Sequence, residues 1–132
     1  MPKSVALFEK AGYLAVLLGI ASGFINYPVA MKVPGATLGM FVTTFVISIS
    51  LEVLLIWLIA RKRKNWARWV WIVLIGVGTA LAVLLSFVHP TQQNGVAGAV
   101  AYYLTYILSI ASAMYLLRPD ARAWFRQTPP DQ

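Results

Sequence analysis

The chain has 132 residues, of which 60% are hydrophobic and only 11% are charged, and it contains no cysteine. Soluble globular proteins carry about 25% charged residues. This composition therefore excludes an ordinary soluble domain, a disordered chain, a disulfide scaffold and a thiolate metal site. Eleven Lys and Arg residues against four Asp and Glu residues give a formal net charge of +7. The composition indicates a basic, helical membrane protein.

Four apolar stretches are each long enough to cross a bilayer, which takes about 20 helical residues. We expect the spans at residues 12–31, 34–60, 69–88 and 96–117. Their hydrophobicity is continuous rather than alternating, which favours helices over barrel strands. Short connections make sequential helices antiparallel. The predicted fold is an all-α, up-down four-helix bundle, a single integral membrane domain over residues 1–132.

The positive charges predict the orientation of this bundle. Every Lys and Arg except Lys32 would lie at one end of it. By the positive-inside rule this end is cytoplasmic, so both termini and the middle loop are expected in the cytoplasm. The five tryptophans are predicted at the same interface, where an indole keeps its N–H near water; they are Trp57, Trp66, Trp69, Trp71 and Trp124.

The cytoplasmic tail, residues 118–132, is expected to contain a short interfacial helix. Asp120 is a candidate for its N-terminal cap, and Trp124 and Phe125 would reach for the membrane. In the last external turn, Asn94 is a candidate cap for the fourth span.

The densest group of charges occupies the middle loop, and it comprises Arg61, Lys62, Arg63, Lys64 and Arg68. A basic tetrad is also found in proteins that bind nucleic acid. A loop of about eight residues between two spans instead favours attraction to anionic lipid headgroups. The expected partner of this loop is therefore the bilayer surface and not a nucleic acid.

Small residues recur at four-residue spacing in the first and third spans. They are Ala15, Gly19 and Gly23 in the first, and Gly76 and Ala80 in the third. Such spacing lets helix backbones approach closely in lipid. The preferred interpretation is packing within one chain, with an interface between subunits as the alternative.

Polar side chains share one face of the second span. Thr44, Ser48 and Glu52 follow one another at intervals of four residues, as Ser22 and Asn26 do on the first span. An ionisable residue inside a membrane is a functional hypothesis by default, because an unpaired charge there is costly. We expect this face to point into the protein interior.

Two roles for Glu52 remain open at this point. The first is a structural ion pair with Lys10, Arg68 or Arg118, which approach the same leaflet. The second is a carboxylate that lines a transport pathway.

Two short segments, Asn-Trp-Ala-Arg-Trp at 65–69 and Arg-Ala-Trp-Phe at 122–125, resemble a pattern in small uncharacterised four-span bacterial membrane proteins. The resemblance implies a location in the bacterial inner membrane and no particular activity. Small multidrug exporters are similar in size and in number of spans. Their essential carboxylate lies in the first span, whereas this chain has no charged residue between Lys10 and Lys32.

The residues do not favour catalysis. The sequence offers no nucleophile–base pair, no carboxylate pair on one face, no metal-ligand cluster and no phosphate-binding glycine loop. We therefore expect no enzyme activity and no cofactor. The leading hypothesis is an accessory, regulatory or immunity-type protein that binds another membrane protein through its helices, or a homo-oligomer. The alternative is a transporter or channel subunit whose oligomer forms a pathway lined by Glu52.

Overall fold

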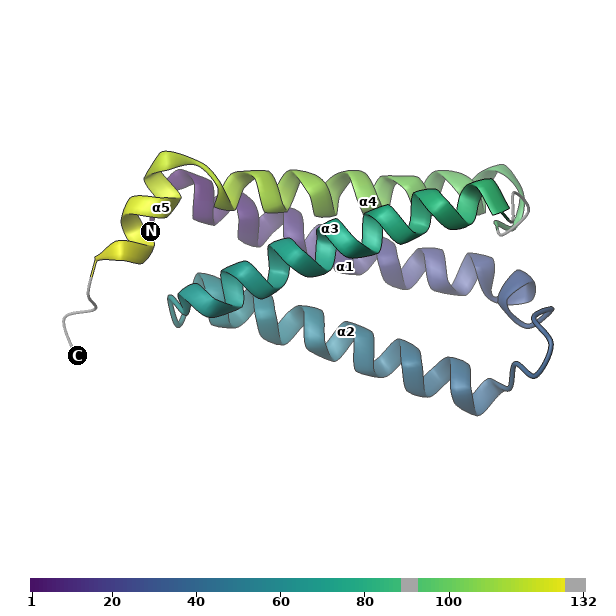
Figure 1. Ribbon diagram of the computed structural model, residues 1–132. Helices are drawn as coiled ribbons and strands as arrows, with labels where there is room; N and C mark the ends of the chain where they lie inside the picture. The colour runs from purple at the N-terminus through teal and green to yellow at the C-terminus, as the bar shows by residue number, and fades with distance from the viewer. Residues whose placement is uncertain (89–92, 128–132) are drawn as a thin grey trace.

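The structure is a computed structural model that describes residues 1–88 and 93–127. Its helices are α1 (Lys3–Ala30), α2 (Leu38–Ala60), α3 (Asn65–Val88), α4 (Gly95–Leu116) and α5 (Pro119–Arg126). The first four are long and apolar enough to cross a membrane, and they form an elongated bundle with α5 across one end (Figure 1). The predicted all-α bundle of four spans, followed by a short C-terminal helix, is confirmed.

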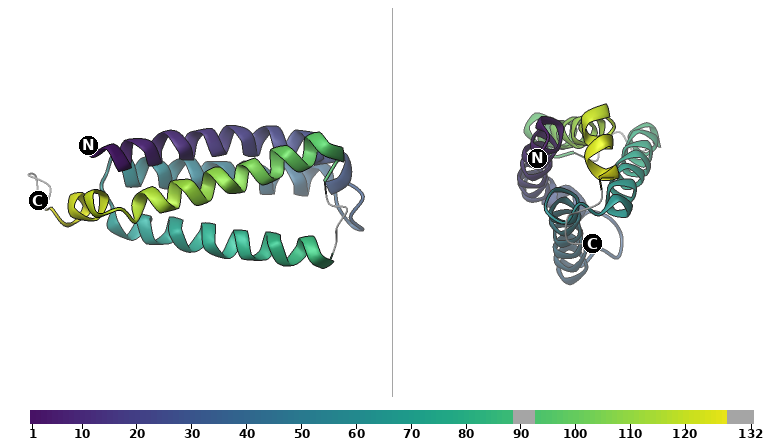
Figure 2. Two further views of the ribbon diagram at one scale, coloured as in Figure 1. Left: turned by 90° about the horizontal axis from the view of Figure 1, so that it is seen from above. Right: turned by 90° about the vertical axis from the view of Figure 1, so that its left-hand side faces the viewer.

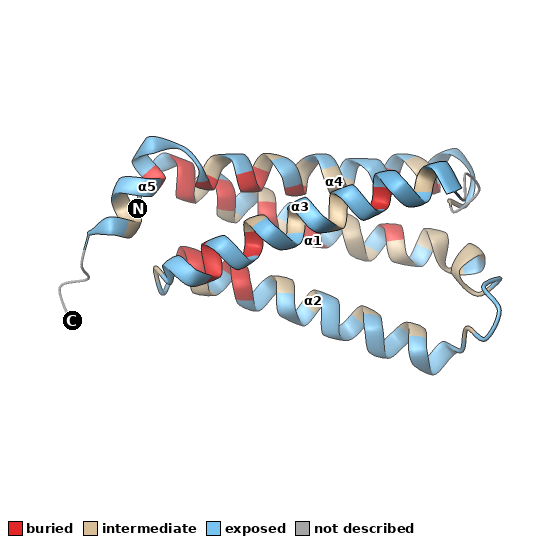
Figure 3. Cartoon of the chain, viewed as in Figure 1, coloured by how far each residue is buried: buried red, intermediate tan, exposed pale blue. Residues whose placement is uncertain are grey.

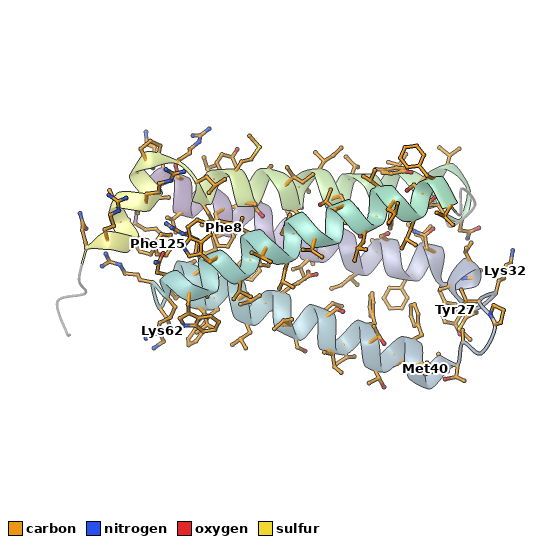
Figure 4. The ribbon with its side chains drawn as sticks, in the orientation of Figure 1. Phe8, Tyr27, Lys32, Met40, Lys62 and Phe125 are labelled. Atoms are coloured by element: carbon orange, nitrogen blue, oxygen red, sulfur yellow. The ribbon has the colours of Figure 1, made fainter. Side chains whose placement is uncertain are left out.

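The two ends of the bundle differ in charge. We call the end that carries the start of α1, the α2–α3 loop and α5 the basic end, and the end with the α1–α2 loop the far end. Lys62 and Lys32 mark these opposite ends in Figure 4.

Three helices begin four or more residues away from the predicted starts, and α4 begins one residue early, at Gly95. Helix α1 starts at Lys3 rather than at residue 12, because Val5 and Phe8 of this early segment are fully buried in the core. Helix α2 starts four residues late, after Thr37, whose hydroxyl accepts a hydrogen bond of 3.2 Å from the Met40 amide. Helix α3 starts at Asn65, so the predicted loop is shorter.

Most of the core lies at the basic end (Figure 3). Its fully buried large side chains include Phe8, Leu55, Ile56, Ile59, Trp71 and Leu116. The rings of Phe8 and Trp71 meet edge to face, with centroids 5.8 Å apart, and Trp71 Nε1 donates a hydrogen bond of 3.1 Å to Ser112 Oγ on α4. The expectation that Trp71 keeps its N–H near water is therefore corrected, because its face of α3 turns toward the other helices.

Helices α1 and α4 form the most extensive helix pair in the bundle. The Asn26 amide nitrogen donates a hydrogen bond of 3.2 Å to the Gly98 carbonyl. In return, Asn26 Oδ1 accepts from the Asn94 backbone N–H at 2.7 Å, and Asn94 Nδ2 donates to the Ile25 carbonyl at 2.9 Å. The side chain of Asn94 thus joins α1 and makes no hydrogen bond that caps its own helix.

Helix α3 diverges from α2 toward the far end (Figure 1). The two views of Figure 2 show that the four long helices surround a common axis. The large apolar side chains on the outside of α2 and α3, such as Ile47, Val73 and Leu84, are exposed in the isolated chain. A bilayer would cover these side chains with acyl tails.

Helix α5 packs across the basic end. Ala121 is fully buried, and Trp124 and Phe125 are half-buried against the core. The Arg63 guanidinium donates hydrogen bonds to the carbonyls of Trp124 and Gln127 at the end of α5. The expectation that Trp124 and Phe125 reach for the membrane is corrected, because both rings lie against the protein.

Candidate functional site

A cavity of about 710 Å³ lies between the four long helices. Polar side chains on three helices contribute to its wall: Ser22 and Asn26 on α1, Ser48 and Glu52 on α2, and Thr105 and Ser109 on α4. Small-molecule sites have volumes of about 300–1,000 Å³. The cavity is therefore large enough for a ligand, and it is formed within a single chain.

Glu52 is half-buried and lines this cavity. It precedes the last residue of α2, Ala60, by eight positions, which places it about 12 Å from the helix end. Between residues 1–88 and 93–127, no hydrogen bond or salt bridge joins its carboxylate to another group; the salt bridge in these ranges connects Arg61 Nε with Glu9 Oε1 at 3.0 Å. The carboxylate thus faces an open space without a protein counter-charge.

The predicted ion pair of Glu52 does not form in the described part of the chain. Lys10 is exposed, Arg118 lies over the Tyr115 ring, and Arg68 lies over the rings of Trp69 and Phe125. All three cations belong to the basic end, and the large buried side chains of the core separate this end from the cavity.

Hydroxyl groups on α4 add acceptors to the cavity wall. Thr105 Oγ1 donates to the Ala101 carbonyl, and Ser109 Oγ donates to the Thr105 carbonyl, both at 2.8 Å. Because each hydroxyl proton is used within the helix, the oxygen retains lone pairs as acceptors. This part of the wall is suited to a group that donates hydrogen bonds or carries positive charge.

Aromatic rings form another part of the wall. Phe41, Trp71, Tyr102 and Tyr106 line the cavity, and the rings of Tyr102 and Tyr106 lie 5.0 Å apart between centroids. The contribution of α4 to the cavity wall was not predicted from the sequence. The available signal was the four-residue spacing of Thr105 and Ser109, which places them on one helix face with Tyr102 close by.

The three polar residues predicted on one face of α2, Thr44, Ser48 and Glu52, line two different cavities. Glu52 lines the central cavity, and Ser48 lines both this cavity and a second one of about 590 Å³ beside the α1–α2 loop. Thr44 lines only the second cavity, and both Thr44 and Ser48 are exposed. Ser22 and Asn26, predicted from α1, do reach the same cavity as Glu52. Of the polar residues predicted on the interior face of α2, Ser48 and Glu52 thus reach the central cavity and Thr44 does not.

The cavity is closed at the basic end. Leu55 and Trp71 form its wall there and are almost fully buried, and Phe8 packs behind Trp71. In the opposite direction the lining extends to Val29 and Val33, beside the α1–α2 loop. The space therefore extends from this buried layer toward the far end.

The small residues of α1 lie against other helices. Ala15 is buried. A Cβ atom at Gly19 would lie 3.6 Å from Thr105 Cγ2, and one at Gly23 would collide with the Phe45 ring.

On α3, by contrast, Gly76 and Ala80 are exposed, and a Cβ atom at Gly76 would meet nothing within 4 Å. The preferred prediction that these two residues pack within the chain is corrected. They lie on the side of α3 opposite Trp71, at about 100° of rotation per residue.

The residues of the basic loop have different surroundings. Arg61 pairs with Glu9, Lys62 lies 5.2 Å from the centroid of the Trp57 ring, and Lys64 is exposed. Arg63 holds the end of α5, whereas Arg68 is buried. The loop is therefore not a uniform solvated patch.

In the described ranges, no group of three or more His, Asp or Glu side chains is placed to hold a metal ion. The site that the structure presents is a cavity with several hydroxyl acceptors and aromatic walls, and Glu52 is the one carboxylate among its described lining residues. Comparisons of the chain with protein-family models, with curated proteins and with solved structures found no match.

Proposed function

We propose that this four-span membrane protein is a small transporter that binds an organic cation in its central cavity, with Glu52 as the counter-charge. The observation that supports the proposal most directly is the Glu52 carboxylate, which lines a cavity of about 710 Å³ and has no partner among the described groups. A carboxylate left without a cation or a proton inside a membrane is costly. A bound cation removes this cost.

The chemistry of the wall favours an organic cation over a metal ion. Among the described residues, Glu52 is the one carboxylate that lines the cavity, whereas Ca²⁺ is held by six to eight oxygen ligands, often from several carboxylates. Aromatic faces such as those of Tyr102, Tyr106 and Phe41 attract ammonium groups. A small alkyl- or arylammonium ion can pair its charge with the Glu52 carboxylate and place its ammonium group against the aromatic faces.

Exchange between cation and proton follows from the same carboxylate. When the cation leaves, protonation of Glu52 keeps the empty cavity neutral. Because the cavity is closed at the basic end, transport requires the buried layer around Phe8, Leu55 and Trp71 to open. The transporter therefore exchanges one cation against one proton across this layer.

A binding experiment tests the proposal. We would measure the binding of radiolabelled benzyltrimethylammonium to the purified protein in detergent by equilibrium dialysis. Glu52→Gln is the test variant, and Glu9→Gln is the matched control. Glu9 lies outside the cavity and pairs with Arg61. We expect Glu52→Gln to weaken binding by about tenfold or more, the loss of one charge pair, and Glu9→Gln to bind like the wild type.

Reconstitution extends this test to transport. In proteoliposomes with a pH gradient, the wild type should drive efflux of the same probe, and Glu52→Gln should abolish it. Circular dichroism and gel filtration would establish that the variant is folded. A folded Glu52→Gln protein with unchanged binding and flux would contradict the proposed role of Glu52.

A second candidate function is the helix-mediated interaction with another membrane protein or with a second copy. The observation in its favour is the exposed face of α3 that carries Gly76 and Ala80, which are small enough for another helix to approach closely. Cross-linking in native membranes followed by gel electrophoresis would detect such a complex. The proposed setting for either function is the bacterial inner membrane, with the basic end in the cytoplasm.

A further inference from the structure

Arg68 is a buried cation at the basic end. Its relative exposure is 7%, and its Nε atom is buried with no hydrogen-bond partner in the described part of the chain. The guanidinium lies between two rings, 5.1 Å from the centroid of Trp69 and 5.1 Å from that of Phe125. Because Phe125 belongs to α5, the charge lies where α5 meets α3.

Two further arginines lie close to Arg68. Arg122 and Arg126 share one face of α5 with Phe125, the ring that contacts Arg68, and their positive charges act on Arg68. Three positive charges that converge in this way repel one another. An anion that joins them offsets this repulsion.

The carboxylates that the structure describes at this end are already engaged. Glu9 pairs with Arg61, and Asp120 accepts hydrogen bonds from Ser4. Neither bonds to Arg68, Arg122 or Arg126. The anion would therefore come from outside the described chain.

We propose that Arg68, Arg122 and Arg126 form a binding site for a phosphate group. Planar guanidinium groups hold phosphate oxygens through pairs of parallel hydrogen bonds, which a lysine cannot do. The site lies at the first turn of a spanning helix, beside the exposed rings of Trp66 and Trp69. This is the depth of lipid headgroups, so an anionic phospholipid supplies the phosphate.

The location gives the site a structural consequence. A phosphate bound to Arg68 on α3 and to the two arginines of α5 links these helices directly. It would stabilise the packing of α5 across the basic end and add to the hydrogen bonds from Arg63. The site is separate from the cavity of Glu52, so it does not depend on the proposed transport.

Lipid titration monitored by native mass spectrometry tests the proposal with the full chain in detergent. The probes are phosphatidylglycerol, phosphatidylcholine and inorganic phosphate. The test variant is Arg122→Gln/Arg126→Gln, which changes two exposed side chains and leaves the buried Arg68 in place. Lys10→Gln/Arg118→Gln removes the same charge from two other exposed positions at the basic end and serves as the matched control.

We expect phosphatidylglycerol to bind the wild type and the control alike, and to bind the test variant about tenfold more weakly for each guanidinium lost. Phosphatidylcholine should bind weakly to all three. Inorganic phosphate that binds with the same dependence on Arg122 and Arg126, without any phosphatidylglycerol binding, would assign the site to free phosphate.

Equal losses in the test and control variants would overturn the proposal, because attraction would then depend on net charge alone. Equal binding of phosphatidylcholine and phosphatidylglycerol to the wild type would overturn it as well. Hydrogen–deuterium exchange offers an independent measurement: phosphatidylglycerol should slow the exchange of the α5 amides in the wild type and in the control, and not in the test variant.

Discussion

At the scale of single residues, Asp120 connects the two ends of the described chain. Its carboxylate accepts hydrogen bonds from the Ser4 hydroxyl at 2.7 Å and from the Ser4 backbone N–H at 3.3 Å. Ser4 lies in the first turn of α1, where backbone N–H groups lack partners within the helix. Asp120 also lies in the first turn of α5, so one negative charge is placed at the N-termini of two helices.

Acid should loosen α5. The hydrogen bonds from Ser4 hold the pKa of Asp120 below its ordinary value. This contact therefore stabilises the packing of α5 fully at pH values above the pKa of Asp120 in the unfolded state. The stabilisation is lost as pH falls through the lowered pKa of the folded state. We expect hydrogen exchange of the amides at 120–126, corrected for the intrinsic rate, to accelerate as pH falls below about 4. In Asp120→Asn the exchange should already be fast at neutral pH, and this acceleration should be absent. An unchanged acceleration in Asp120→Asn would show that other groups release α5.

Trp71 provides the second test at this scale. Replacing it by Phe removes the hydrogen bond from Nε1 to Ser112 and keeps an aromatic ring against Phe8. We expect Trp71→Phe to lower the free energy of unfolding by about 1 kcal/mol, measured by SDS titration with circular dichroism. The same change at Trp66, which is exposed, should have no effect. Equal effects at both positions would show that the buried hydrogen bond contributes nothing.

At the scale of helices, only some of the small residues lie where two helices pack closely together. Gly23 lies against the Phe45 ring, and Gly98 lies against Asn26. Gly76 faces open space. The same four-residue spacing thus serves packing within the chain on α1 and not on α3.

Leucine substitutions separate these two situations. Gly23→Leu should destabilise the bundle by about 1–3 kcal/mol, because the new side chain forces the Phe45 ring and α2 to move. Gly76→Leu should leave the stability of the monomer unchanged. A complex that forms through α3 would instead be lost in Gly76→Leu, which cross-linking in native membranes would detect. A stable Gly23→Leu protein would contradict the packing that the structure shows.

At the scale of the whole molecule, the two ends of the bundle are predicted to lie on opposite sides of the membrane. The chain has no cysteine, so single cysteines report their own position. We expect an impermeant maleimide to label Lys32→Cys in intact cells and to label Lys64→Cys only after permeabilisation, since both positions are exposed and the basic end is expected inside. Labelling in the reverse order would place the basic end outside.

The sequence by itself determined the class of the protein, its four spans and the ends of the bundle at which the charges gather. These properties follow from hydrophobicity summed over about 20 consecutive residues, which decides membrane insertion and needs no tertiary information. The polar residues Ser22, Asn26, Ser48 and Glu52 were also found in this way, because a polar group in an apolar span stands out. The residues of α4 did not stand out, since single hydroxyl groups are common in spans.

Only the tertiary structure decided which helix faces meet. In lipid, an apolar face gains little from exchanging acyl chains for another helix, so hydrophobicity does not select the partner. Specific contacts between residues far apart in the sequence select the partner. The hydrogen bonds of Asn26 with Gly98 and Asn94 join α1 to α4, and these two helices form the most extensive pair. The same packing buries Trp71 and Arg68, and it leaves Glu52 beside a cavity instead of a cation. These outcomes depend on how three or four helices fit together, which no local pattern in the chain records.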